Sequence, residues 1–186
     1  MRGLGGLAAA LALTASAAGA QQAGYSSHLV NDTTLVLVAG ERATVRLESD
    51  GRLTLLSVVH ALPAEATPGQ ARGEARELVT APPGTVAFVL GNLAAGGNLK
   101  VENATSRAFD YRAAFLDGPD WPAKALPISV CTVLPRVASF EGWERRNPPA
   151  LLVGALRPRD SNQVICPAPA DSSGDGPPSG LKPADD

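Results

Sequence analysis

The chain has few of the side chains that catalysis and nucleic-acid binding require. Of its 186 residues, two are histidines and two are cysteines, and aromatic residues make up 4%. Its 16 basic and 18 acidic side chains leave a net charge of −2. Proteins that bind nucleic acid need a strongly basic surface to displace counterions. We therefore expect no nucleic-acid partner.

Long apolar runs are also missing once the N-terminus is passed. The uncharged run from Gly3 to Ala20 follows Arg2 and ends in small residues, which is the pattern of a signal peptide with its cleavage site. A membrane anchor is the competing interpretation, but the apolar centre from Leu4 to Leu13 is shorter than the ~20 residues needed to cross a bilayer. We predict that residues 1–20 are a signal peptide. The mature chain is then periplasmic or extracellular, with no membrane span.

Cysteine chemistry is limited to one pair, Cys131 and Cys166. The two residues lie too far apart in sequence for the close spacing that redox and metal motifs usually show. An even pair in an oxidising compartment predicts a structural disulfide, and closing a loop of this length contributes about 4 kcal/mol in the chain-entropy account. We expect no metal and no other cofactor.

The mature chain consists of short β-prone runs separated by turn residues. Apolar and polar residues alternate over 42–48, 86–90 and 109–115, which predicts strands with one buried face. Other runs are continuously apolar and predict strands covered on both faces, namely Leu35–Val38, Leu53–Val59, Val130–Leu134 and Leu151–Leu156. Turn signals such as Ser49-Asp50-Gly51 lie between the runs.

About eight such strands predict an all-β fold, a single immunoglobulin-like β-sandwich over residues 21–166, with a closed barrel as the alternative. The segment 61–77 is expected to be a loop or to contain one short helix over about 70–78. Residues 167–186 are mostly Pro, Ala, Gly, Ser and Asp. Such a tail buries too little apolar area to offset its ordering entropy, so it is predicted to be disordered.

No motif with a catalytic mechanism is present. A histidine-based mechanism would have to use His28 or His60, and neither lies in G-x-S-x-G or H-E-x-x-H. The simpler interpretation of His60 is a residue at the end of a strand. Carboxylates for glycoside hydrolysis could be drawn from a set of acids that any small β protein would offer: Asp110, Asp117, Asp120 and Glu141. A small secreted hydrolase using His60 or an acidic pair is therefore the alternative, not the leading hypothesis.

The most unusual stretch is 139–149, which holds Trp143, Arg145 and Arg146. Trp and Arg dominate interface hot spots, so these three residues are the first binding candidate. In the competing interpretation, Trp143 and Trp121 complete the core at an open end of the sandwich. Open strand edges are a second route to function, because exported β domains pair there with a strand of a partner. The sequence thus predicts a binding or envelope-structural module whose expected partner is another envelope protein.

Overall fold

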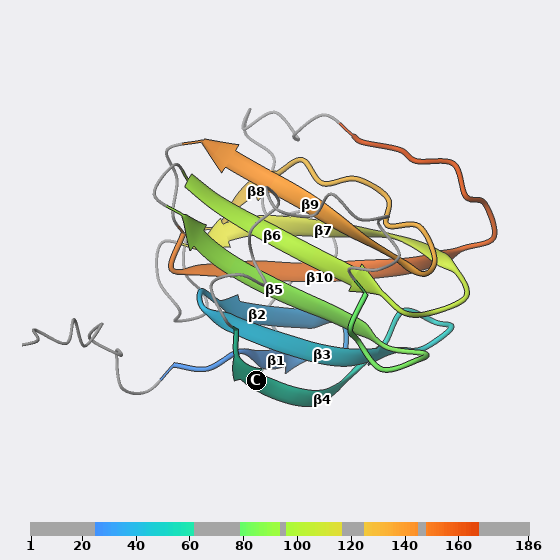
Figure 1. The fold of residues 1–186 in the computed structure, drawn as a ribbon, viewed down its shortest axis with the longest axis horizontal. Helices are drawn as coiled ribbons and strands as arrows, with labels where there is room; N and C mark the ends of the chain where they lie inside the picture. Colours follow the sequence, from blue (N-terminus) through green and yellow to red (C-terminus); the bar gives the residue numbers. More distant parts are fainter. Residues whose placement is uncertain (1–24, 62–78, 94–95, 117–124, 145–147, 168–186) are drawn as a thin grey trace, which may run out of the picture.

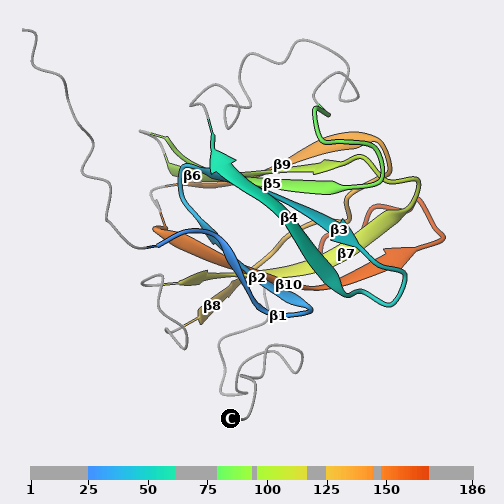
Figure 2. The same cartoon turned by 90° about the horizontal axis from the view of Figure 1, so that it is seen from below.

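The computed structural model describes residues 25–61, 79–93, 96–116, 125–144 and 148–167, which form ten β-strands in two packed antiparallel sheets (Figure 1). Sheet A has, in spatial order, β1 (His28–Asn31), β2 (Thr34–Val38), β10 (Ala150–Arg159), β7 (Ala108–Leu116) and β8 (Ala125–Ile128). Sheet B has β4 (Leu53–His60), β3 (Glu41–Leu47), β5 (Val86–Leu93), β6 (Gly96–Asn103) and β9 (Val137–Glu144). The view from below separates the two layers (Figure 2). The predicted sandwich is confirmed, with ten described strands instead of about eight.

The length of a connection does not decide whether the chain changes sheet: two residues separate β2 from β3, which lie in different sheets, whereas β4 and β5 lie in the same sheet although 25 residues separate them. The pairs β3–β4, β5–β6 and β7–β8 are antiparallel neighbours. The chain changes sheet after β2, β6, β8 and β9. As the last strand, β10 inserts between β2 and β7 and pairs with both. Sheet A therefore joins the beginning and the end of the described chain.

The core forms as the alternation predicted. Ala43, Val45, Phe88 and Phe109 are completely buried between the sheets, and Tyr111 packs at centroid distances of 6.2 and 6.0 Å from Phe88 and Phe109. Successive strand residues point to opposite faces. The central strands β2 and β10 are therefore buried on both sides, as expected, and contribute to a second apolar cluster on the other face of sheet A: Val36, Ala114, Leu116, Ala150 and Leu152.

Two strand expectations were wrong in detail. Leu53–Val59 was expected to be covered on both faces, but β4 is the edge of sheet B, and Leu56 and Val59 are 43% and 52% exposed. Val130–Leu134 is not a regular strand: only Val133 makes a bridge, to Phe109. This segment crosses from β8 in one sheet to β9 in the other, so it cannot follow either ladder, although Val130 and Val133 are both buried.

The turn predicted at Ser49-Asp50-Gly51 is present between β3 and β4. The Glu48 N–H donates to the Arg52 carbonyl at 2.9 Å, and Gly51 has a φ of +90°. A Cβ atom at Gly51 would lie 2.5 Å from the Leu156 carbonyl oxygen. Glycine is required here both by the left-handed backbone and by the close approach of β10.

Several predictions concern parts of the chain outside the described residues. These are the signal peptide 1–20, the short helix over 70–78, the tail from 168 onward, and the side chains of Asp117, Asp120, Trp121, Arg145 and Arg146. No helix that could span a membrane occurs in the part of the chain that the structure describes.

Candidate functional site

The predicted disulfide between Cys131 and Cys166 is present, with an S–S distance of 2.07 Å. It joins the segment between β8 and β9 to the segment that follows β10. Next to the bond, the Thr132 N–H donates to the Ile165 carbonyl at 2.9 Å and the Ile165 N–H donates to the Thr132 hydroxyl at 3.1 Å. Ser129 also donates to the Pro167 carbonyl. The end of the described chain is thereby fixed along the crossing segment.

A cleft of about 330 Å³ lies beside this disulfide. Its apolar lining comes mainly from the end of β8 and from the fixed C-terminal segment: Pro127, Ile128, Val130, Ile165 and Pro167. Its charged lining comes from Asp110 and Arg112 on β7 and from Arg157 on β10. The cleft thus places arginines beside apolar walls in one concave surface.

A β-bulge brings Arg157 to the cleft. Gly154 pairs with Arg112 and Arg157 pairs with Asp110, so two residues of β10 oppose one residue of β7. Within the bulge, Ala155 has a φ of +51°. Residues an odd number of positions apart normally point to opposite faces of a strand, and the extra residue reverses that alternation. Gly154 and Arg157 therefore share the outer face of sheet A with Arg112.

The two arginines of the cleft differ from its carboxylate in how they are paired. Asp110 accepts a hydrogen bond from the Thr132 hydroxyl at 2.6 Å and forms an ion pair with Arg159 at 3.1 Å. Within the described part of the chain, no ion pair joins an acidic side chain to Arg112 or Arg157, although Arg157 stands opposite Asp110 in the ladder. Because its single acid is already neutralised, the cleft presents net positive charge to an incoming ligand.

Three polar groups from β7 and β9 lie inside the sandwich, and one of them, Tyr111, also lines the cleft. Glu141 accepts a hydrogen bond from the Cys131 N–H at 2.8 Å, and burial raises the pKa of this carboxyl group. Burial also raises the pKa of the Tyr111 hydroxyl, with a further contribution from the charge of Glu141. Among the described residues, the hydroxyls of Tyr111 and Ser139 have no hydrogen-bond partner. Of the predicted acids, Asp110 and Glu141 thus hold two adjacent residues of the crossing segment, Thr132 and Cys131.

Of the three residues predicted first as a binding candidate, the structure describes only Trp143. Trp143 lies on β9, is half-buried, and packs edge-on against Phe115 with ring centroids 5.2 Å apart. Arg145 and Arg146 are outside the described residues. His60 is exposed at the end of β4, opposite Glu41, and neither His60 nor Ser57 lines the cleft.

The cleft arginines were missed by sequence reasoning. Arg112 stands at a polar position of the alternating segment 109–115, and this was a signal that its side chain would face outward. Arg157 carried no such signal. The face to which the Arg157 side chain points depends on the bulge at Ala155, and alanine is not a residue that marks a bulge in the sequence.

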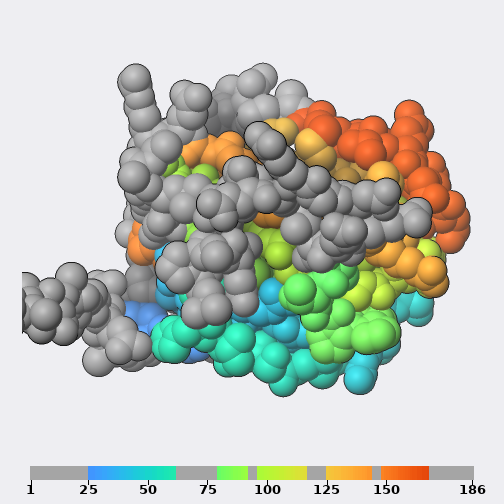
Figure 3. All heavy atoms as spheres, viewed as in Figure 1, coloured from blue at the N-terminus to red at the C-terminus, as the bar shows by residue number. Residues whose placement is uncertain are grey.

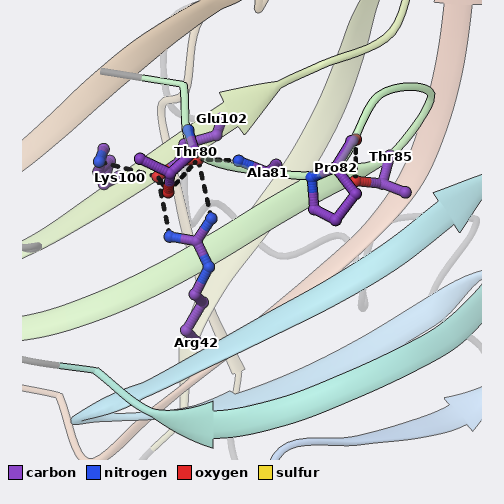
Figure 4. Close-up of polar contacts among 7 residues, drawn as sticks. All are labelled: Arg42, Thr80, Ala81, Pro82, Thr85, Lys100 and Glu102. Carbon is purple, nitrogen blue, oxygen red and sulfur yellow. Dashed lines mark hydrogen bonds and ion pairs between the residues drawn. The ribbon is translucent and has the colours of Figure 1, made fainter. Parts of the chain in front are cut away.

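A second unpredicted cluster lies on the outer face of sheet B, around the completely buried carboxylate of Glu102 (Figure 4). Arg42 donates to both carboxylate oxygens at 2.9 and 2.8 Å, and Lys100 pairs with one of them at 2.8 Å. The N–H groups of Thr80 and Ala81 donate to it at 2.7 and 2.8 Å. Burial by itself would raise the pKa of Glu102, but the hydrogen bonds from Arg42 and Lys100 outweigh it and lower the pKa to about 2.

The Glu102 cluster fastens residues 79–81 to the sheet, and all of its acceptor capacity is used in doing so. It therefore has the character of a structural clamp. No group of three His, Cys, Asp or Glu side chains suited to a metal ion occurs among the described residues. The cleft beside the disulfide is the best-formed candidate for ligand contact. Comparison with known proteins gives no matching family model, no matching curated protein and no matching solved structure.

Proposed function

We propose that the chain is an exported binding or envelope-structural module and that it contacts its ligand through the cleft beside the Cys131–Cys166 disulfide. Export is supported by the signal-peptide pattern of residues 1–20. It is supported further by the disulfide itself, because such bonds persist in oxidising compartments.

The observation that carries the binding proposal is the charge of the cleft. Arg112 and Arg157 face it from neighbouring strands without an acidic partner in the described chain, while Asp110 is neutralised by Arg159. An arginine pairs well with a carboxylate because its planar guanidinium donates two parallel hydrogen bonds. The ligand is therefore expected to be anionic.

The walls of the cleft add an apolar requirement. Ile128, Ile165 and Pro167 line it, and its volume of about 330 Å³ is at the small end for ligand pockets. A carboxylate attached to a compact apolar group fits both features. An acidic side chain of a partner protein flanked by apolar residues supplies this chemistry, and so does a small aromatic acid.

The hydrolase alternative has less support. Glycoside hydrolysis needs two carboxylates facing one reacting bond. Asp110 and Glu141 instead bond to the hydroxyl of Thr132 and the N–H of Cys131, and these contacts position the wall of the cleft. We therefore assign both acids to holding the crossing segment in place.

Titration with two probes, followed by NMR, tests the binding proposal. We expect benzoate, or a peptide of alternating Glu and Leu, to shift the resonances of residues 110–113 and 127–132. The double variant Arg112→Gln/Arg157→Gln should weaken binding at least tenfold, because ion-assisted hydrogen bonds contribute roughly 1.5–3 kcal/mol each. The control Arg46→Gln removes an exposed arginine from β3 in the other sheet and should bind as the wild type does. Shifts elsewhere, or equal affinity of all three proteins, would refute the assignment of the cleft.

A further inference from the structure

Strand β7 has a gap in its pairing at the cleft. On the side away from β10, Ala113 pairs with Ile128, where β8 ends, and Phe109 forms an isolated bridge with Val133. No described residue pairs on that side with residues 110–112, which lie between these two pairs and line the cleft. The cleft therefore lies where the ladder of sheet A is interrupted.

The interruption leaves the main chain of Tyr111 without a partner. The Phe109 N–H donates to the Val133 carbonyl at 3.1 Å, and the Val133 N–H donates to the Phe109 carbonyl at 3.0 Å, so both groups of Phe109 point toward the gap. Main-chain groups alternate in direction along a strand, so those of Tyr111, two residues on, point the same way. Among the described residues, none forms a main-chain hydrogen bond with Tyr111 on this side. The gap thus contains one N–H donor and one carbonyl acceptor from a single residue.

The crossing segment between β8 and β9 passes the gap without filling it. It has one residue more than β7 between the two pairs, so it cannot follow the ladder residue by residue. Its Cys131 N–H donates to Glu141 of sheet B at 2.8 Å, and not to β7. On its other side, Thr132 is bonded to Ile165 and the disulfide fastens Cys131. These contacts fix the path of the segment and leave Tyr111 to another partner.

The C-terminal residue of a peptide matches the two free groups of Tyr111. Its N–H donates to the Tyr111 carbonyl while its carboxylate accepts from the Tyr111 N–H, as in one hydrogen-bonded pair of an antiparallel ladder. A residue within a strand fits less well, because the pairs at Ile128 and Val133 close both ends of the gap and a strand would have to continue through them. A chain that ends in the cleft avoids this obstacle.

We infer that the cleft captures the C-terminal residue of a partner chain through the main chain of Tyr111. Arg112 and Arg157 neutralise the terminal carboxylate, and an apolar side chain of the captured residue contacts Ile128 and Ile165 in the wall. The inference rests on the proposed anion-binding function and adds recognition of a peptide main chain to it.

A chain end can reach this cleft from solvent. The side chains of Arg112 and Arg157 are exposed, and so are residues 160–167, which include part of the wall. In Figure 3, the orange-red atoms of the chain that follows β10 lie on the outside of the molecule. The acid of the cleft, Asp110, is neutralised by Arg159 and so offers little repulsion to a carboxylate.

Three small ligands test the main-chain pairing in a titration followed by NMR. N-acetylleucine carries the carboxylate, the amide N–H and an apolar side chain, whereas 2-acetoxy-4-methylpentanoate has an ester oxygen in place of that N–H. The ester should bind about three- to tenfold more weakly, because it cannot donate to the Tyr111 carbonyl. N-acetylleucinamide, which lacks the charge, should bind at least tenfold more weakly than the acid.

The outcomes separate this inference from the anion-binding proposal. Equal affinity of N-acetylleucine and its ester would overturn the pairing with Tyr111 and would leave the anion site intact. If none of the three ligands nor benzoate bound at the cleft, both proposals would be wrong.

Hydrogen exchange reports on the Tyr111 N–H directly. In the free protein it should exchange much faster than the N–H of Ala113, which is paired with Ile128 on the same side of β7. Saturation with N-acetylleucine should slow exchange at Tyr111 and leave Ala113 unchanged. Equal protection of the two N–H groups in the free protein, or no slowing at Tyr111 when the ligand is bound, would contradict the inference.

Discussion

At the scale of single residues, the decisive feature is how buried charges are compensated. Glu102 is completely buried and receives donors from two cationic side chains and two backbone N–H groups. Glu141 is only partly compensated, by a single N–H. Burial favours the neutral acid, and hydrogen bonds favour the carboxylate. The pKa values of these two glutamates consequently move in opposite directions, down for Glu102 and up for Glu141.

Replacing Glu102 with glutamine should be strongly destabilising. Glu102→Gln leaves Arg42 and Lys100 buried without an anion, and removing one partner of a buried ion pair costs about 3–5 kcal/mol. Denaturant unfolding followed by circular dichroism measures the loss. The control Asp50→Asn breaks a fully exposed pair with Arg52 and should have little effect. Equal stability of both variants would mean that the clamp contributes nothing to folding.

The pH dependence of stability should reverse sign near pH 4.5. The folded pKa of Glu102 lies below its unfolded value of 4.5, so its contribution is complete above pH 4.5 and is lost as the pH falls toward 2. The pKa of Glu141 is raised above 4.5, so protonation of Glu141 stabilises the folded state as the pH falls toward 4.5. Free energies of unfolding measured from pH 7 to 2 should show the gain followed by the loss. Glu141→Gln should remove the gain alone, and an unchanged profile would contradict this account.

At the scale of elements, two irregularities decide what the strands present. The bulge of β10 turns Arg157 toward the cleft, and the bulge of β4 exposes Leu56 at the edge. The β3–β4 turn is packed closely against β10 through Gly51. Small backbone adjustments thus control which side chains face the candidate binding surface and which lie at the edge of sheet B.

Two glycine-to-alanine variants should separate backbone strain from steric clash. Gly51 and Gly40 both have positive φ angles, +90° and +82°, so alanine at either position should cost about 1–2 kcal/mol in left-handed strain. A Cβ atom at Gly51 would also meet the Leu156 carbonyl at 2.5 Å, while Gly40 has open space around it. Thermal unfolding should therefore show a clearly larger decrease in Tm for Gly51→Ala. Similar values would show that β10 moves away without cost.

At the scale of the whole molecule, the disulfide joins two segments that line the cleft, the one between β8 and β9 and the one after β10. It closes a loop with a sequence separation of 35 residues. The same segment is held by hydrogen bonds between Thr132 and Ile165. The bond therefore serves stability and also the shape of the candidate site.

Removing the disulfide should lower stability by about 2–5 kcal/mol, as is usual for small secreted domains. The double variant Cys131→Ala/Cys166→Ala should also speed hydrogen exchange at the N–H of Thr132 and Ile165 more than at core strands such as β5. Exchange measured by NMR below the unfolding temperature checks this. If protection at Thr132 and Ile165 persisted, the hydrogen bonds alone would be sufficient to hold the segment.

The sequence by itself determined the fold class, the disulfide pair and the two-sided burial of β2 and β10. These follow from local information: residue periodicity, turn chemistry and a cysteine count of two. Only the tertiary structure decided that the apolar run Leu53–Val59 lies at an edge, that Glu102 gathers Arg42 and Lys100, and that Arg112 and Arg157 meet at one cleft. Strand order and bulges arise from pairing between distant segments, and no pattern within one segment contains that information.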